Sequence, residues 1–239
     1  MEKYVVRQFE RPDKALIERL GALDVTTIYE AQGRSGLMHN RLRPVIPGST
    51  ACGPALTVHC QAGDSLMIEA ALEVCQPGDL FVITADSDEI YGMVDDKIVS
   101  ALIHKRIRGV VIDSGVRSVQ KLRKLGLPIW AKGIYSRGAT QSKGGWINVP
   151  VVCGECAVRP GDVILADDDG VVVVAKEQAQ TVWEQARKRL RAEEEEKKKI
   201  ARGELRLDFG GLRKYLQADN VHYYESELVQ TDRKGNVDR

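Results

Sequence analysis

The residues best suited to chemistry gather around an arginine at a turn. Residues 111–122, "VIDSGVRSVQKL", read as the end of a buried strand, a turn containing glycine and the start of a helix, with Arg117 at the turn. A guanidinium can hold a carboxylate through two parallel hydrogen bonds, and the free N–H groups of a helix start also favour anions. We therefore interpret Arg117 as an anion-binding residue, with an exposed ion pair as the alternative.

Serine and aspartate residues flank this arginine in sequence or in the preceding helix. Ser118 follows Arg117 directly, where it would make a good helix N-cap but a poor Mg²⁺ ligand. Asp95 and Asp96 begin a predicted helix, where a carboxylate caps the helix or holds a metal through water. Asp113 precedes the turn and is expected to secure it by hydrogen bonds. The residues alone leave capping and ligand binding both open.

The five cysteines give little sign of a disulfide scaffold or a metal site. An odd number of cysteines in a chain of 239 residues argues against a disulfide framework. Cys153 and Cys156 form one CxxC pair, "CGEC", with no second pair or nearby histidine, which makes zinc a weak prediction. We expect the pair at the end of a strand.

Hydrophobic periodicity and turn residues predict an α/β fold with a partly mixed sheet. Asp24 is expected to cap the second of two helices in the first stretch. The predicted helices lie within 13–33 (two), 63–74, 96–107 and 118–125. The predicted strands are 54–60, 78–85, 109–113, 128–132, 147–153, and a hairpin of 162–166 and 170–175.

A long helix is predicted from residue 176 onward. Val182, Ala186 and Leu190 lie along one stripe, which continues to Glu193 in the run "EEEEKKK". This pattern predicts three parts: an α/β domain over 1–175, a helical extension over 176–216 that packs on a neighbouring subunit, and a tail over 217–239.

Composition restricts the expected partners and location. The chain has 35 basic and 34 acidic residues, a formal net charge of +1, which gives no reason to expect nucleic acid or a membrane surface. Apolar runs fall short of the roughly 20 residues that span a bilayer. The charged N-terminus does not resemble a secretory signal, so a cytoplasmic location is expected.

Three stretches resemble the RraA-like superfamily and, within it, the 4-hydroxy-4-methyl-2-oxoglutarate / 4-carboxy-4-hydroxy-2-oxoadipate aldolases. They are "KIVSALIHKRIRGVVIDSGVRSVQKLRKLGLPIWAKG", "INVPVVCGECAVRPGDVILADDDGVVVV" and "KRLRAEEEEKKKIARGELRLD". The resemblance implies a β/β/α layered sandwich with a long C-terminal helix. It also implies homotrimers or homohexamers with active sites between subunits, and Mg²⁺ or Mn²⁺ as cofactor.

The resemblance assigns roles to particular positions. Its fingerprint is an Asp, twenty residues, then Arg-Asp; here Asp96 and Arg117 match, Ser118 replaces the second Asp, and Asp95 replaces a usual glycine. Implied metal residues are Asp96, Ser118 and Glu193, with Glu194 as the alternative to Glu193. Implied substrate-binding groups are Arg117, the backbone amides around Lys97 and Ile98, and Ser65. Implied catalytic residues are Arg117, Asp96 and Glu193.

The resulting hypothesis is a metal-assisted lyase that cleaves a C–C bond of a small 2-oxo or hydroxy acid. It would release pyruvate by aldol cleavage, decarboxylate oxaloacetate, or both. Two alternatives remain: a metal-independent relative with changed lyase or hydrolytic chemistry, and a non-catalytic RraA-like regulatory binding protein. Methyltransfer is not supported, because no glycine-rich nucleotide turn follows a first strand.

Overall fold

The computed structural model describes residues 2–224, which fall into two compact units. The first unit extends to Leu190 and the second begins at Arg191. The predicted boundaries at 175/176 and 216/217 remain predictions, and the part of the predicted tail over 225–239 lies outside the described residues. None of the helices in the described part of the chain has the length and apolarity needed to cross a bilayer.

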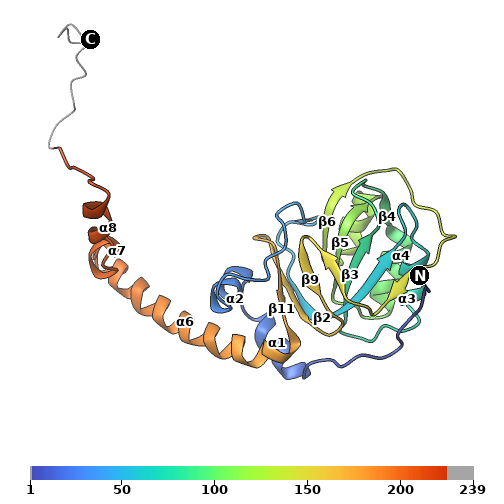
Figure 1. Cartoon of the computed structure of the whole chain (residues 1–239), viewed down its shortest axis with the longest axis horizontal. Helices are drawn as coiled ribbons and strands as arrows, with labels where there is room; N and C mark the ends of the chain where they lie inside the picture. Colours follow the sequence, from blue (N-terminus) through green and yellow to red (C-terminus); the bar gives the residue numbers. More distant parts are fainter. Residues whose placement is uncertain (1, 225–239) are drawn as a thin grey trace, which may run out of the picture. The chain divides into compact units, whose positions relative to one another are not determined.

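Helices are interspersed among the strands over residues 51–134 of the first unit, whereas strands alone follow over residues 146–174 (Figure 1). The helices are α1 Lys14–Gly21, α2 Val25–Ala31, α3 Leu66–Ala71, α4 Asp96–His104, α5 Val119–Leu125, α6 Ala179–Ala201, α7 Arg206–Phe209 and α8 Arg213–Ala218, and a 3₁₀ turn covers Lys176–Gln178. The strands are β1 Arg43–Pro44, β2 Ala51–Cys60, β3 Leu80–Ala85, β4 Gly92–Val94, β5 Gly109–Val116, β6 Ile129–Ile134, β7 Trp146–Ile147, β8 Val151–Cys153, β9 Cys156–Val158, β10 Val163–Ala166 and β11 Val171–Val174.

A curled, mixed sheet forms the framework of the first unit. Its strand order is β1-β6-β5-β3-β2-β10-β11, with β4 paired to β5 and β7 paired to β2. The pairs among β2, β3, β4, β5 and β6 are parallel, whereas β1, β7, β10 and β11 pair antiparallel. A separate hairpin joins β8 and β9. This arrangement confirms the predicted mixed α/β fold.

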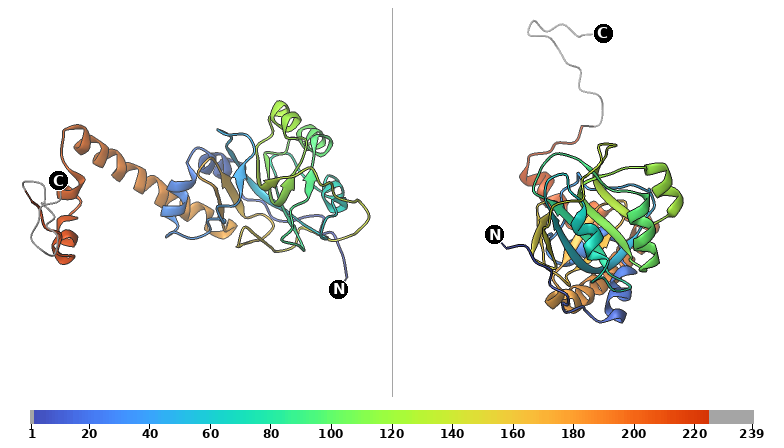
Figure 2. Two further views of the ribbon diagram at one scale, coloured as in Figure 1. Left: turned by 90° about the horizontal axis from the view of Figure 1, so that it is seen from above. Right: turned by 90° about the vertical axis from the view of Figure 1, so that its right-hand side faces the viewer.

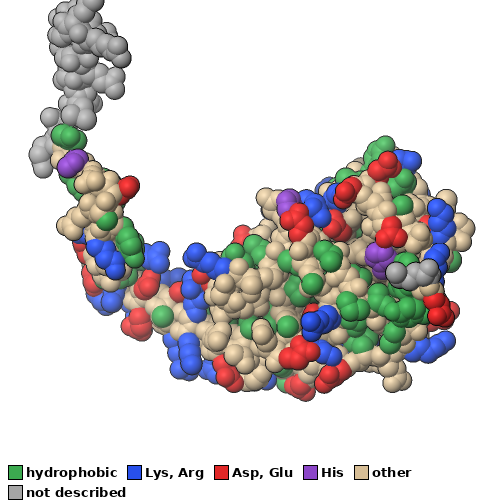
Figure 3. Space-filling view, viewed as in Figure 1, with side chains coloured by type: hydrophobic (Ala, Val, Ile, Leu, Met, Phe, Trp, Pro, Cys, Tyr) green, Lys and Arg blue, Asp and Glu red, His purple; other side chains and the backbone are tan. Residues whose placement is uncertain are grey.

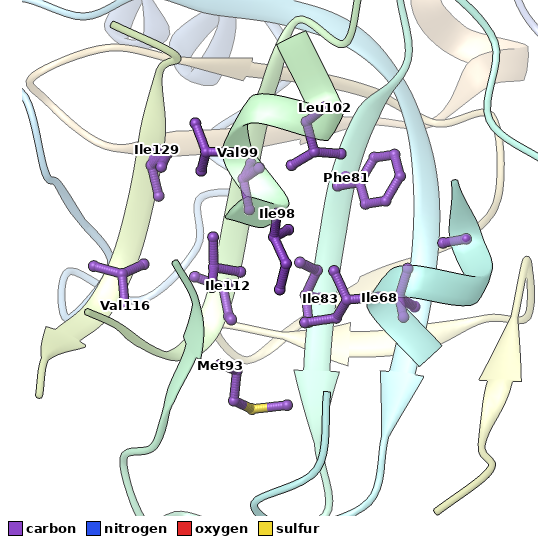
Figure 4. Packing of buried hydrophobic residues seen from close by; sticks show 14 of the residues in the cluster. Ile68, Phe81, Ile83, Met93, Ile98, Val99, Leu102, Ile112, Val116 and Ile129 are labelled. Atoms are coloured by element: carbon purple, nitrogen blue, oxygen red, sulfur yellow. The ribbon is translucent and has the colours of Figure 1, made fainter. Parts of the chain in front are cut away.

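Alternating side chains fill a core on each face of the sheet, as the two-residue period of a strand requires. In β3, Phe81 and Ile83 share a cluster with Ile68 of α3 and Leu102 of α4 (Figure 4), while Leu80 and Val82 belong to the cluster on the other face. A third cluster packs α1, α2 and the start of α6 against β10 and β11. The two helical groups therefore cover different parts of the sheet (Figure 2).

Most predicted elements are present, with changed ends. The strand predicted over 109–113 continues to Val116, and the helix predicted over 96–107 ends at His104. The strand predicted over 147–153 is two strands, β7 and β8, because Asn148 has a left-handed backbone (φ 57°) and Pro150 precedes β8.

Acidic and basic side chains are interspersed on the face shown in Figure 3.

The second unit begins within α6 and contains α7 and α8. Its described part has no buried residue in α7 or α8, and Leu205, Leu212 and Tyr215 are exposed there. An ion pair of 3.2 Å joins Arg206 to Glu196.

The buried carboxylate of Asp64 fixes the loop that follows β6. Asp64 is 1% exposed and accepts hydrogen bonds from the Thr140 hydroxyl at 2.7 Å and from the backbone amides of Ser142 and Lys143 at 2.8 and 3.1 Å. It also accepts from the Leu66 amide at the start of α3. Burial alone would raise the pKa of Asp64, but these hydrogen bonds lower it overall.

Replacing Asp64 by Asn should destabilise the first unit in a pH-dependent way. The folded-state pKa of Asp64 is lowered, so its stabilising effect is present above the ordinary carboxyl pKa of about 4 and is lost as pH falls through the lowered value. We expect Asp64→Asn to cost about 1–3 kcal/mol at pH 7 and less as pH drops toward the lowered pKa, measured by urea unfolding. Asp88→Asn, at a fully exposed side chain, is the control. An equal cost at both ends of this pH range would contradict the prediction.

Candidate active site

A small cavity of about 230 Å³ lies where the starts of α3 and α4 meet the ends of β4 and β5. Parallel pairing of β4 with β5 brings Val94 opposite Val116, so the residues that follow these two strands are neighbours. Residues 139–141 close another side, held there by Asp64. The lining residues are Ser65, Glu69, Gly92, Met93, Asp95, Lys97, Ile98, Arg117, Ala139 and Gln141.

The Asp95 carboxylate joins the two chain segments at the centre of this cavity. Its Oδ1 accepts hydrogen bonds from the backbone amides of Lys97 at 3.1 Å and Ile98 at 3.3 Å, so Asp95 is the N-cap of α4. Its Oδ2 accepts a hydrogen bond of 2.7 Å from Nη2 of Arg117. The pair is only partly exposed, Asp95 at 15% and Arg117 at 40%.

Two glycines make room for the Arg117 side chain. A Cβ on Gly138 would lie 2.4 Å from Nη1 of Arg117, and a Cβ on Gly92 would lie 2.8 Å from its Cβ. Gly92 is also pressed against the carbonyl oxygen of Tyr135, 2.4 Å from the position of a Cβ. Gly92 and Gly138 form a β-bridge, and the guanidinium of Arg117 lies directly against these two glycines.

Ser118 stands at the N-cap position of α5 but does not cap the helix with its side chain. Its backbone is left-handed (φ 57°, ψ 35°), whereas an N-cap residue ordinarily has extended backbone, and the side chain makes no capping hydrogen bond. The predicted capping role is therefore wrong. Lys121, one turn later, donates a 3.0 Å hydrogen bond to Oδ2 of Asp96. Lys121, with a smaller contribution from the Ser118 hydroxyl, lowers the pKa of Asp96.

These residues do not form a divalent-metal site within the first unit. Mg²⁺ prefers carboxylate oxygens and water, and the carboxylate that the Ser118 hydroxyl contacts, Asp96, is paired with the Lys121 ammonium. Among residues 2–224, no three His, Cys, Asp or Glu side chains are grouped so that they could hold a metal. Glu193 and Glu194 lie on α6 in the second unit, and their assignment stays a prediction.

The structure brings together most of the predicted substrate-binding groups. Ser65, Lys97, Ile98 and Arg117 all line the cavity, whereas Asp96 does not and points to Lys121. Ser65 is buried and donates a hydrogen bond to the Thr140 carbonyl at 3.4 Å.

Six residues in or under the cavity were missed by sequence reasoning: Glu69, Gly92, Met93, Gly138, Ala139 and Gln141. For Glu69 a signal existed, because it lies four residues after Ser65 and so on the same side of α3. In the described part of the chain, the Glu69 carboxylate has no hydrogen bond or ion pair. The roles of the two glycines follow only from contacts with residues distant in the sequence.

The CxxC pair is part of a hairpin turn, at the end of a strand as expected. Cys153 on β8 lies opposite Cys156 on β9, and both are free thiols. Burial raises the pKa of both, so neither is a reactive thiolate at neutral pH. Asp113 accepts two hydrogen bonds from Arg41 and one from the Gly154 amide, which fixes this hairpin.

Two larger hollows elsewhere in the first unit lack comparable chemistry, and a third, of about 450 Å³, holds His59 with both ring nitrogens already hydrogen-bonded, to Thr84 at 2.9 Å and Asp86 at 2.7 Å. One of about 320 Å³ between α1 and β10 contains Cys52, where burial raises the pKa of the thiol to about 12. Another, of about 430 Å³, contains Arg41 and Asp113, which are committed to each other. The cavity around Arg117 is therefore the best candidate for an active site.

Fold and site define an α/β protein with a small cavity, lined by Arg117 and the start of α4, at the ends of parallel strands. The chain matches the RraA-like family model, described as Aldolase/RraA, over residues 24–173. It therefore belongs to the RraA-like family.

Individual relatives agree with this assignment. A Halalkalibacterium halodurans protein named "Putative 4-hydroxy-4-methyl-2-oxoglutarate aldolase" is 30% identical over 185 residues, covering 77% of this chain and 88% of that protein. Streptomyces coelicolor RraAS2, described as an unusual member of the RNase ES inhibitor RraA family, is 30% identical, with a TM-score of 0.70 over 80% of this chain and 99% of that one. An uncharacterized Pseudomonas syringae pv. tomato protein, 21% identical, shares the fold, with a TM-score of 0.73 over 83% of this chain and 93% of its own.

Gly138→Ala should displace the Arg117 guanidinium while leaving the fold intact. The added Cβ meets the far end of a flexible side chain, and Gly138 is exposed without a left-handed backbone. We expect a change in unfolding free energy below about 1 kcal/mol, and a crystal structure in which Arg117 no longer contacts Asp95. Gly144→Ala, whose Cβ would meet only Lys3 at 3.3 Å, is the control. An unmoved Arg117 in the Gly138→Ala variant would refute the proposed role of this glycine.

Proposed function

We propose that this chain is a C–C lyase that acts on a small 2-oxo or hydroxy acid and releases pyruvate. The observation that carries the proposal is the position of Arg117. Its side chain packs against two glycines, beside the first amides of α4, at the wall of a small cavity. Guanidinium and helix N-terminus together suit a carboxylate. Membership of a family described as Aldolase/RraA, and the name of the Halalkalibacterium relative, support the reaction class.

Arg117 and α4 bind the acid and stabilise the charge that develops on it. Arg117 uses Nη2 for Asp95, which leaves its other donors for the carboxylate and 2-oxo oxygen of a ligand. The positive end of α4 and Lys97 lie on the same side of the cavity. Fixed donors of this kind favour an enolate oxygen over a neutral ketone, which lowers the barrier to cleavage.

Glu69 is the base that this cavity offers. In aldol cleavage Glu69 takes the proton of the C4 hydroxyl, a new C=O double bond forms there, and the C3–C4 bond breaks. The electron pair of that bond becomes the C2–C3 double bond of the pyruvate enolate, and the proton now held by Glu69 is transferred to C3, which completes pyruvate and restores the Glu69 carboxylate. Oxaloacetate decarboxylation needs no such base, because the C4 group that departs as CO₂ is already a deprotonated carboxylate.

No step of this mechanism is assigned to a metal, since Lys121 already pairs with Asp96, the carboxylate that the Ser118 hydroxyl contacts. The Mg²⁺ or Mn²⁺ expected from the resemblance therefore stays outside the proposal for the first unit. A homotrimer or homohexamer in which Glu193 reaches a neighbouring subunit is part of the proposal, and it would add one carboxylate to the site.

A regulatory binding protein is the second candidate. In the Asp95–Arg117 and Asp96–Lys121 ion pairs, each charged side chain neutralises its partner. Such pairing weakens substrate binding, which a protein without catalytic activity tolerates. The RraAS2 structure, at 30% identity, belongs to a family described by ribonuclease inhibition. Absence of turnover together with binding to a ribonuclease would favour this candidate.

Pyruvate release from oxaloacetate and from 4-carboxy-4-hydroxy-2-oxoadipate tests the lyase proposal. We expect turnover that EDTA does not reduce, because Asp96 is already paired with the Lys121 ammonium. Arg117→Lys should lower kcat/KM about ten- to a hundredfold, since an ammonium cannot replace the planar fork. Arg137→Lys, at an exposed ion pair with Glu89, should have no effect. Loss of activity with EDTA would contradict the metal-free mechanism, and no turnover would contradict the lyase.

A double variant, Ser118→Asp with Lys121→Ala, should create affinity for Mn²⁺. It places a second carboxylate beside Asp96 and removes the competing ammonium, and aspartate tolerates the left-handed backbone of position 118. We expect Mn²⁺ to bind about tenfold or more tightly than to the unaltered protein, measured by electron paramagnetic resonance. Lys124→Ala, on the same helix, is the control. Equal Mn²⁺ affinity would show that position 118 does not face Asp96.

A further inference from the structure

We propose that Asp95 is a specificity-determining residue, because its carboxylate is an internal ligand of the groups that would hold the carboxylate of a substrate. This inference rests on the proposed function in one respect only: the cavity receives a carboxylate. A substrate must displace Asp95 to gain the Nη2 donor of Arg117 and the amides of α4, so acids that offer nothing but a carboxylate and a keto oxygen are disfavoured.

The geometry of Asp95 is that of a bound carboxylate. One oxygen accepts from the amides of Lys97 and Ile98 at 3.1 and 3.3 Å, and the other accepts from Arg117 at 2.7 Å. These three donors come from two segments of the chain, and they converge on a side chain that is 15% exposed at the cavity wall. A carboxylate from outside would seek the same three donors.

The other capped helices show that capping does not require such an arrangement. Asp13 caps α1 by accepting from the Leu16 amide, and Asp24 caps α2 by accepting from the Thr27 amide at 2.6 Å. In the described part of the chain, neither the Asp13 nor the Asp24 carboxylate forms an ion pair with an arginine. The contact from Asp95 to Arg117 is therefore additional to its role as a cap.

The charge of the cavity leads to the same conclusion. Its lining carries two acids, Glu69 and Asp95, and two bases, Lys97 and Arg117. With Asp95 paired to Arg117, a small monoanion meets no uncompensated guanidinium. Removing the Asp95 charge leaves one excess positive charge and frees an Arg117 donor, and both changes favour an anion.

The test is the binding of oxamate, an unreactive monoanion with the shape of pyruvate, measured by calorimetry in metal-free buffer. Asp95→Asn keeps a capping oxygen but removes the charge, and Asp95→Gly removes both groups at little cost to the helix. We expect oxamate to bind about ten- to a hundredfold more tightly to Asp95→Gly than to the unaltered protein, with Asp95→Asn between them. Asp24→Asn and Asp24→Gly are matched controls at another N-cap and should leave binding unchanged.

A third variant locates the binding. Adding Arg117→Ala to Asp95→Gly should abolish the gain, since the freed guanidinium is its source. Equal oxamate affinity in the unaltered and Asp95 proteins, or no binding in any of them, would overturn the inference. Because the readout is affinity, a protein that fails to release pyruvate from either substrate still gives a result here. Failure of the lyase proposal and failure of this one are thereby distinguishable.

Discussion

The hydrogen bond between Arg117 and Asp95 is the contact on which the cavity depends. It ties the residue after β5 to the residue after β4, and Asp95 in turn caps the first turn of α4. The neighbouring strands are parallel, so their carboxyl ends lie together and the two side chains can meet. Ligands bind outside the carboxyl ends of such strands in many α/β proteins, and this cavity lies in that position.

The pair is effective because its surroundings restrict both partners. The Arg117 side chain lies across Gly92 and Gly138, where a Cβ at either position would displace it. Asp95 is fixed by two amides of α4, and α4 itself is held by Ile98 and Leu102 in the main core. An exposed ion pair of two mobile chains contributes little, whereas one whose partners are already ordered loses less entropy when it forms.

Features set by neighbouring residues in the sequence could be predicted, and features set by distant ones could not. Alternating apolar residues predicted strands such as β3 and β5, and Asp24 was correctly expected to cap α2, because period and capping act over a few residues. Arg117 could be found at its turn for the same reason. The contact between Asp95 and Arg117 joins residues 22 positions apart. The packing of Gly138 against Arg117 depends on a loop that Asp64, distant in the sequence, holds in place. Ser118 looked like a cap because its residue type is typical of one, but its left-handed backbone is imposed by the junction of β5 and α5.

Two departures from the pattern expected of its relatives, at positions 95 and 118, affect the charge of the same site. That pattern has glycine at position 95 and aspartate at 118, whereas this chain has Asp95 and Ser118. The total charge of the site is thus unchanged, but one carboxylate stands on the Arg117 side instead of beside Asp96. On the Arg117 side it competes with an anionic ligand, and beside Asp96 its loss leaves a single carboxylate that Lys121 neutralises. One relocated charge therefore weakens the attraction for an anion and for a cation together, so both changes are expected to be felt at the same site.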